Sequence, residues 1–156
     1  MTLSPDSRLK TSRSLPGAPR RIPFNVSSPR FSPDGRWIAY ESDESGTPEV
    51  YVALTAGAGE KKRLSPAGGR QPRWRRDGKE LYYVAPDGSV MAVPVTLGEK
   101  IEAGVPAALF RVETDVANYD VSPDGSRFLV STRLERFPES PLRVIVNWDA
   151  LLPGKR

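Results

Sequence analysis

The sequence predicts an all-β chain built from repeats of one four-stranded antiparallel unit. A ten-residue stretch, FSPDGRWIAY at residues 31–40, recurs as WRRDGKELYY at 74–83 and as VSPDGSRFLV at 121–130. The aspartates of the three copies lie 43 and 47 residues apart, a period typical of one blade of a β-propeller. Sixteen prolines and thirteen glycines supply the turns that such a chain needs. We therefore predict a propeller segment of about three four-stranded blades, part of a propeller with roughly six to eight.

The Asp-Gly turn inside each repeat combines residue types that reverse a chain. In the first copy, proline presets the backbone angle φ, aspartate accepts hydrogen bonds from nearby amides, and glycine adopts a positive φ without strain. The middle copy carries Arg75-Arg76 where the other two carry Ser-Pro, but it keeps the Asp-Gly pair. A ring of carboxylates that binds a cation is the alternative role, although repetition of a structural unit already explains these positions. The predicted structural turn residues are Pro33, Asp34, Gly35, Asp77, Gly78, Pro123, Asp124 and Gly125.

Short apolar runs predict the strands of the three units. Because they are rich in aromatic and branched side chains and are bounded by turn signals, these runs are typical of strands buried on both faces. We interpret their aromatic residues as packing between blades rather than as a cage for a ligand. The predicted strands are 38–40, 81–83 and 128–130 after the turns, 49–54, 89–93 and 142–148 as their partners, and 62–64 and 107–110 at the outer edges.

The order of an aromatic residue, Ser-Pro-Asp-Gly, a basic residue and an apolar strand resembles the WD-like repeats of TolB-type β-propellers. Similar repeats occur in the propeller domains of prolyl-oligopeptidase-type peptidases. The resemblance spans residues 20–149, with repeats near 29–68, 69–111 and 118–149. It implies a noncatalytic module, either a TolB-like scaffold protein or the remnant of a peptidase propeller that gates substrate entry.

Four further segments narrow this resemblance. They are similar to the C-terminal propellers of bacterial receptor-like serine/threonine kinases, which implies protein interaction or ligand sensing within a larger signalling protein. We take this kinase-associated module as the main hypothesis of function and keep the peptidase propeller and the TolB-like scaffold as alternatives. The segments are GRQPRW at 69–74, LYYVAPDG at 81–88, MAVPV at 91–95 and SPLRVIVNW at 140–148.

The composition excludes several kinds of chemistry. The chain has no cysteine and no histidine, so it forms no disulfide, no thiolate or imidazole metal site and no Ser-His-Asp triad. It also lacks the Gly-x-Ser-x-Gly turn of hydrolases and the glycine-rich and catalytic loops of kinases. We predict that this chain is not an enzyme, has no catalytic residue and takes no cofactor or metal.

Positive charge gathers at the N-terminus and in the second repeat. Residues 1–19, rich in Ser, Pro and Arg, predict a disordered basic arm rather than a nucleic-acid-binding one, and residues 150–156 predict a C-terminal tail. Residues 20–24 would form the outer strand of a preceding blade. In the second repeat, side-chain alternation along a strand favours a solvated turn, and an anion-binding interaction patch is the alternative. The residues of that patch are Arg70, Arg73, Trp74, Arg75 and Arg76.

No stretch of the sequence is long and apolar enough to span a membrane, and the first residues lack the apolar core of a secretory signal. We therefore expect no membrane insertion. For the chain as written we expect a cytoplasmic location, whereas the same module in a receptor would lie outside the cytoplasm.

Three blades cannot enclose a propeller axis, since closed propellers have about 4 to 8. The outer faces of the first and last blades would expose apolar surface, which marks an interaction site or an aggregation hazard. We therefore expect a protein partner, or self-association, through these open blade faces. The chain would be a piece of a longer propeller, half of a ring closed by two copies, or the complement of a separately encoded subunit.

Overall fold

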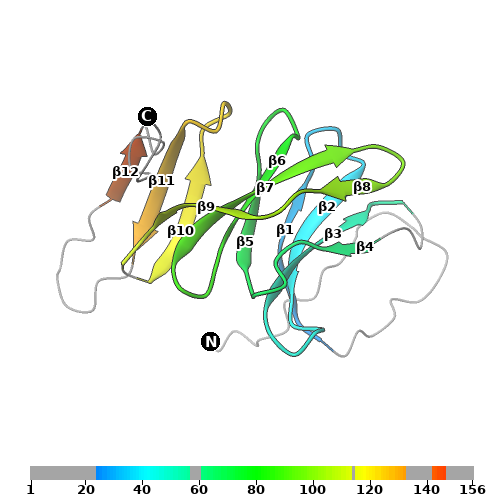
Figure 1. Cartoon of the computed structure of the whole chain (residues 1–156), viewed down its shortest axis with the longest axis horizontal. Helices are drawn as coiled ribbons and strands as arrows, with labels where there is room; N and C mark the ends of the chain where they lie inside the picture. Colours follow the sequence, from blue (N-terminus) through cyan, green and yellow to red (C-terminus); the bar gives the residue numbers. More distant parts are fainter. Residues whose placement is uncertain (1–23, 57–60, 114, 133–141, 147–156) are drawn as a thin grey trace, which may run out of the picture.

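Strands account for all regular structure in the part of the chain that the computed structural model describes, which comprises residues 24–56, 61–113, 115–132 and 142–146. The strands form three antiparallel sheets that follow one another along the chain (Figure 1). Within these residues there is no helix long and apolar enough to cross a membrane. The architecture confirms the predicted all-β fold built from antiparallel blades.

Each sheet is one blade of the segment. Blade 1 comprises β1 (Val26–Phe31), β2 (Trp37–Ser42), β3 (Glu49–Leu54) and β4 (Lys61–Arg63). Blade 2 comprises β5 (Arg70–Trp74), β6 (Glu80–Val84), β7 (Ser89–Leu97), β8 (Ile101–Ala103) and β9 (Ala107–Arg111), with both β8 and β9 paired to β7. The described part of blade 3 comprises β10 (Val116–Val121), β11 (Arg127–Thr132) and β12 (Leu142–Val146).

The predicted apolar runs lie in β2, β6 and β11, and their predicted partners lie in β3, β7 and β12. Strand β7 continues beyond Pro94 and pairs there with β8, which the sequence did not predict. The predicted strand covers 89–93 and stops before Pro94. Proline has no backbone N–H to donate, but the Pro94 carbonyl accepts a hydrogen bond from the Gly104 amide at 2.8 Å. The predicted arm at 1–19, residues 20–23 of the leading strand and the tail at 150–156 lie outside the described residues.

Alternation of side chains in the central blade divides the core into two layers. Odd-numbered residues of β6 and β7, such as Leu81 and Val93, pack with Trp37 of blade 1. Even-numbered residues, such as Tyr82, pack with Phe128 of blade 3. All five of these side chains are at most 1% exposed. Blade 2 is therefore enclosed by its two neighbours, as in a stack of propeller blades.

The first strands of the three blades lie side by side, because β5 contacts β1 on one side and β10 on the other (Figure 1). In a propeller, this is the side that faces the central channel, so we call β1, β5 and β10 the innermost strands. The pairing of each innermost strand with the next strand shifts register once. Such bulges bend a strand and redirect its side chains.

Candidate interaction site on the innermost strands

The Asp-Gly turns after the innermost strands are closed by the backbone and by the aspartate. The Gly35 amide donates to the carbonyl three residues earlier at 2.8 Å, and Gly35 has a φ of 71°. The Asp34 carboxylate accepts a hydrogen bond from the Arg36 amide at 3.1 Å. The third copy repeats both contacts around Asp124 and Gly125, at 3.1 and 2.8 Å. Two distant segments thus form the same local structure.

The middle turn reaches this shape with different side chains. In the first copy, the Ser32 hydroxyl donates to the Asp34 carboxylate. In the middle copy, the Arg75 guanidinium donates to both carboxylate oxygens of Asp77, at 2.7 and 2.8 Å. The Lys79 amide also donates to Asp77, at 3.0 Å. A bidentate arginine therefore takes the place of the serine hydroxyl.

The other turn residues differ in how closely the neighbouring blade approaches them. Pro33 and Pro123 are exposed at the second turn position. Gly78 has a φ of 72°, and Gly125 has a φ of 76°. A methyl group on Gly125 would lie 2.5 Å from the Tyr82 hydroxyl oxygen, which no side chain tolerates. Glycine is therefore required at this position both by its backbone angle and by the contact between blades 2 and 3.

The three turn carboxylates are bound by their own turns. Side-chain donors of the same turn lower the pKa of each of these aspartates, and at Asp77, whose main donor is Arg75, the pKa falls to about 2. Within the described ranges, no three acidic side chains gather in a group that could hold a metal ion. The carboxylate oxygens therefore stabilise the hairpins in which they lie.

The bulges place two non-glycine residues in the left-handed region. Ser28 of β1 has a φ of 52° and Gln71 of β5 a φ of 56°, and each directly precedes a proline. This conformation costs about 1 to 2 kcal/mol for a residue with a side chain. Gln71 also links all three blades. Its backbone N–H donates to the Glu41 carboxylate at 3.3 Å, and its side-chain Nε2 donates to the Ala117 carbonyl at 3.1 Å.

A cleft of about 470 Å³ opens on the innermost strands. Arg30 and Arg73 occupy the same repeat position in it, four residues before the turn aspartate, and Asp120 occupies that position in the third repeat. The patch predicted from the sequence does not include Arg30 and Asp120, because they belong to the first and third repeats and the patch is confined to the second. Alignment of the repeats on their aspartates is the signal that finds both. The cleft is lined by Arg30, Phe31, Arg73, Trp74, Asn118, Tyr119 and Asp120.

Neutral oxygen atoms hold the two arginines of the cleft. Each donates through Nη1 to the carbonyl of the proline before it, at 2.8 Å for Arg30 and 2.9 Å for Arg73. Arg73 also donates through Nη2 to Asn118 Oδ1 at 2.9 Å, and its guanidinium carbon lies 5.4 Å from the centre of the Tyr119 ring. Burial, together with the nearby charge of Arg30, lowers the pKa of Arg73. The cleft wall is therefore electropositive at this point.

Aromatic side chains border the same wall. Trp74 is half-buried, and its indole Nε1 donates to the Arg30 carbonyl at 3.0 Å, which joins β5 to β1. Phe31 is 66% exposed. The cleft thus combines guanidinium groups with apolar ring surface, a combination that is common where proteins bind ligands.

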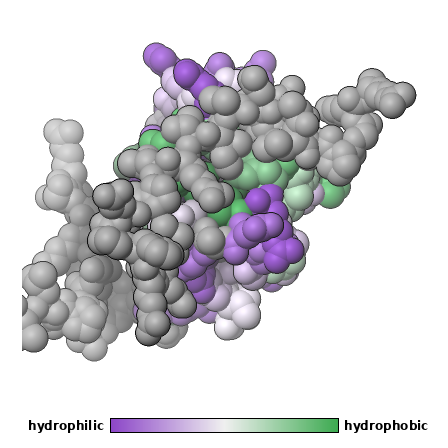
Figure 2. Space-filling view, turned by 90° about the vertical axis from the view of Figure 1, so that its left-hand side faces the viewer, coloured by the Kyte–Doolittle hydropathy of each residue, from purple (hydrophilic) through white to green (hydrophobic). Residues whose placement is uncertain are grey.

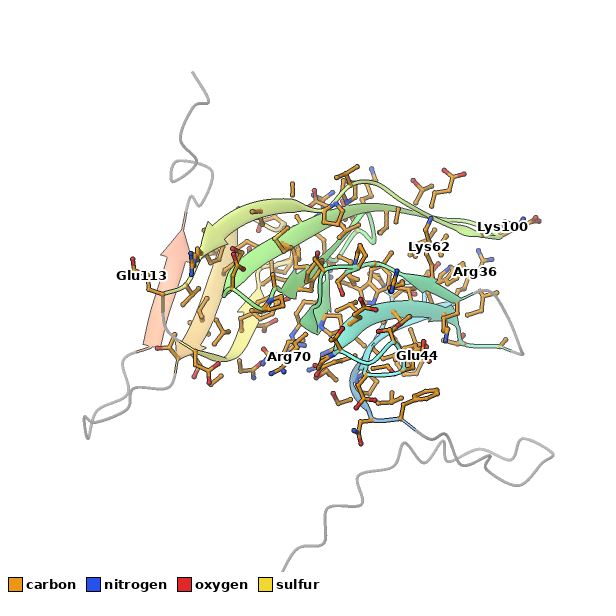
Figure 3. All side chains as sticks on the ribbon, turned by 60° about the horizontal axis from the view of Figure 1, so that its bottom comes forward. Arg36, Glu44, Lys62, Arg70, Lys100 and Glu113 are labelled. Carbon is orange, nitrogen blue, oxygen red and sulfur yellow. The ribbon has the colours of Figure 1, made fainter. Side chains whose placement is uncertain are left out.

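The structure distributes the predicted basic patch over three places. Arg73 and Trp74 line the cleft. Arg75 bends into its own turn and into contact with blade 3, and Arg76 is exposed beside it. Arg70 is exposed at the start of β5 (Figure 3). Only two of the five residues are therefore brought together, because strand alternation and the turn separate the rest.

A larger cleft of about 840 Å³ lies beside the hairpin of β7 and β8. This hairpin extends from blade 2 along blade 1. Arg36 donates to the Gly98 carbonyl at 3.1 Å, and Lys62 donates to the Ile101 carbonyl at 3.4 Å. Figure 3 shows Arg36 and Lys62 near the end of the hairpin that carries Lys100. These contacts attach the two blades to each other, so we assign this region to blade packing.

The three blades have the fold of a segment of a TolB-like, WD40-like β-propeller. No protein-family model matches the chain. The Tol-Pal system protein TolB of Syntrophus aciditrophicus (strain SB) is 44% identical over 43 residues, which are 28% of this chain and 10% of that protein. The uncharacterized peptidase YuxL of Bacillus subtilis (strain 168) is 39% identical over 74 residues, which are 46% of this chain and 10% of that protein.

Two solved structures share this fold. TolB from Acinetobacter baumannii superposes on 79% of the chain with a TM-score of 0.57 and 21% identity, and the match covers 30% of that TolB. A putative 6-phosphogluconolactonase from Bacteroides uniformis superposes on 89% of the chain with a TM-score of 0.51 and 19% identity, and the match covers 45% of that protein. The chain therefore spans less than half of these proteins, and about a tenth of each curated relative.

Proposed function

We propose that the chain is a noncatalytic propeller module that serves protein interaction, and that its outer blade faces join it to further blades. The single observation that carries this proposal is the face of blade 1 directed away from blade 2. The absence of cysteine and histidine from the sequence supports the noncatalytic part of the proposal.

The repeats predict what covers that face. Apolar side chains stand four and six residues after each turn aspartate. In blade 3 these are Phe128 and Val130, which pack against blade 2 and are at most 1% exposed. In blade 1 they are Ile38 and Tyr40, which are only half-buried, and Tyr40 stacks on Tyr51 with ring centres 5.8 Å apart. In blade 1, no described blade packs against these two positions. Because the equivalent side chains of blade 3 pack against a blade, we infer that another blade is the partner of blade 1 as well.

The opposite end of the segment is more polar. Leu129 of blade 3 is 40% exposed, and its neighbours on the same strand face, Arg127 and Ser131, are exposed as well. Figure 2 views the molecule from this end and shows both hydrophobic and hydrophilic areas. A partner at blade 3 would therefore need polar groups that match, whereas a partner at blade 1 would pack against the half-buried Ile38 and Tyr40.

Two parent proteins remain as candidates besides a stand-alone scaffold. The short match to YuxL favours a peptidase propeller, in which this module would gate substrate entry to a hydrolase domain elsewhere. A receptor-type kinase stays a hypothesis that rests on the four sequence segments alone. The DNA on either side of the reading frame distinguishes them: a hydrolase frame supports the first, a kinase frame the second, and neither supports a TolB-like scaffold.

The proposal is tested by the mass of the purified chain, measured by light scattering behind a sizing column over a range of concentrations. We expect a discrete species of at least twice the 17.2 kDa chain mass. Ile38→Glu should return this species to a single chain because it places a charge on the open face of blade 1. Arg76→Glu, on an exposed turn, is the matched control and should leave the mass unchanged. A folded monomer at every concentration, unaffected by Ile38→Glu, would falsify self-association through this face.

A further inference from the structure

We propose that the cleft on the innermost strands is a binding site for a small oxyanion-bearing ligand, a carboxylate or a phosphate, held by Arg30 and Arg73. This inference goes beyond the proposed role in protein interaction. It requires only residues of β1, β5 and β10, so it does not depend on what covers the outer blade faces.

The two guanidinium groups have unused donors. An arginine side chain has five N–H donors, and the structure occupies one of them on Arg30 and two on Arg73. All three donate to neutral carbonyl or amide oxygens. The ion pairs found among the described residues involve Lys61, Arg63 and Arg75, not these two arginines. Both positive charges are therefore oriented by the protein without being neutralised in a direct ion pair.

The charges also lie where an anion gains most from them. Arg73 is half-buried, and the pKa of its guanidinium is lowered first by burial and then by the charge of Arg30. A half-buried arginine beside a second positive charge, here the exposed Arg30, is destabilising until an anion lies between them. Tyr119 and Asp120 raise the pKa of Arg73, but the pKa is still lowered overall. An oxyanion that bridges Arg30 and Arg73 would relieve this repulsion, and the guanidinium geometry suits two-oxygen acceptors.

The rest of the cleft defines the ligand more closely. A volume of about 470 Å³ fits a small molecule rather than a folded domain. Trp74 and the exposed ring of Phe31 provide apolar walls beside the arginines. Asp120 lies in the same lining and offsets one of the two positive charges, which favours a ligand with a single anionic group. We therefore expect a ligand with one carboxylate or phosphate group and an apolar or planar remainder.

The indole N–H of Trp74 offers a direct probe of the site. It donates to the Arg30 carbonyl at 3.0 Å, so its NMR signal should respond to an anion bound at Arg30. The experiment titrates the 15N-labelled chain with inorganic phosphate, with acetate and with benzoate, using sodium chloride of equal ionic strength as the control. We expect a saturable shift of this signal, assigned by Trp74→Phe, with phosphate or with the carboxylates, and tighter binding of benzoate than of acetate.

Two substitutions make the test specific. Arg30→Gln and Arg73→Gln should each raise the dissociation constant by about tenfold or more, because each removes a charged donor. Arg127→Gln, on the outer face of blade 3, should leave it unchanged. The indole signal of Trp37, which is 0% exposed in the core, reports whether each variant is folded. A shift that equals the effect of chloride, or one that survives both substitutions in folded protein, would overturn the proposal. If phosphate alone binds, the ligand carries a phosphate; if only the carboxylates bind, it carries a carboxylate.

Discussion

The two blade interfaces fill equivalent repeat positions with different side chains. Between blades 1 and 2, blade 1 contributes the large side chain of Trp37, and blade 2 contributes the smaller Leu81. Between blades 2 and 3, the residue equivalent to Trp37 is Glu80, and Phe128 of blade 3 fills the core instead. Trp37, Leu81 and Phe128 are all 0% exposed. Each interface core is therefore filled by one large aromatic side chain, which comes from the first blade of the pair in one interface and from the second blade in the other.

The interfaces also differ in what supports them. The first is reinforced by the hairpin of β7 and β8, whose Ile101 joins the core around Trp37. The second is concentrated on one ring: Phe128 meets Tyr82 edge-on at 5.1 Å and Phe110 at 5.3 Å between ring centres. Glu80 lies at its rim and accepts a hydrogen bond from Tyr82 at 2.7 Å. We expect the first interface to tolerate single changes better than the second.

Replacement of Phe128 should therefore have the largest effect. Phe128→Ala removes a fully buried ring and its edge-to-face contacts, so we expect a loss of about 3 to 5 kcal/mol in the free energy of unfolding. Urea denaturation followed by circular dichroism measures it. Leu129→Ala is the matched control one residue away, on the opposite strand face and 40% exposed, and should change stability by about 0.5 kcal/mol or less. Similar losses in the two variants would contradict the concentration of this interface on one ring.

Loss of the hairpin contact should cost less. Ile101→Ala truncates a side chain that is 2% exposed between β8 and blade 1, and we expect a loss of about 2 to 4 kcal/mol. Amide hydrogen exchange should show faster exchange in β8 and at the end of β7 than in the rest of blade 2. Val105→Ala, at a side chain that is 84% exposed, serves as the control. If Ile101→Ala costs more than Phe128→Ala, the first interface is the less tolerant of the two.

The rim of the second interface predicts a dependence on acid. Hydrogen bonding to Arg75 lowers the pKa of Asp77 from 3.8 to about 2. A lowered pKa stabilises the folded state above pH 3.8, and this contribution is lost as the pH falls towards about 2. The melting temperature of the wild type should therefore exceed that of Asp77→Asn at pH 5, above this window, and the difference should shrink as the pH falls through it. A difference that stays constant from pH 5 to about 2 would contradict this role of Asp77.

The repeat made the blades predictable, because each turn combines residues that reverse the chain and each following run is apolar. The hairpin extension was not predictable in this way. Pro94 ends a strand by the usual rule, and the sequence carries no sign that Ile101 returns to the core of a neighbouring blade. The left-handed backbone at Ser28 and Gln71 was hidden for a similar reason, since neither residue type is typical of that conformation.

The candidate site was only half visible in the sequence. The basic run predicts a patch that includes Arg73 and Trp74, but Arg75 belongs to a turn and does not line the cleft. The other half, Arg30 and Asp120, comes from neighbouring repeats and is brought close only by the stacking of blades. Local patterns identify residues along one strand, whereas a channel wall is made of one residue from each of several strands.

The smallest expected effect tests whether the middle turn has the same backbone as the other two. Arg76 stands where the first and third copies carry Pro33 and Pro123, and it is exposed. Arg76→Pro should stabilise the protein by about 0.4 to 1 kcal/mol, because proline restricts the unfolded chain and the other two turns already hold proline at this position. Pro123→Arg should cause a loss of similar size, and urea denaturation measures both. If Arg76→Pro is destabilising, the bidentate contact between Arg75 and Asp77 requires a backbone that proline cannot adopt. The two interfaces would then differ in the geometry of their rims as well as in the residues that fill them.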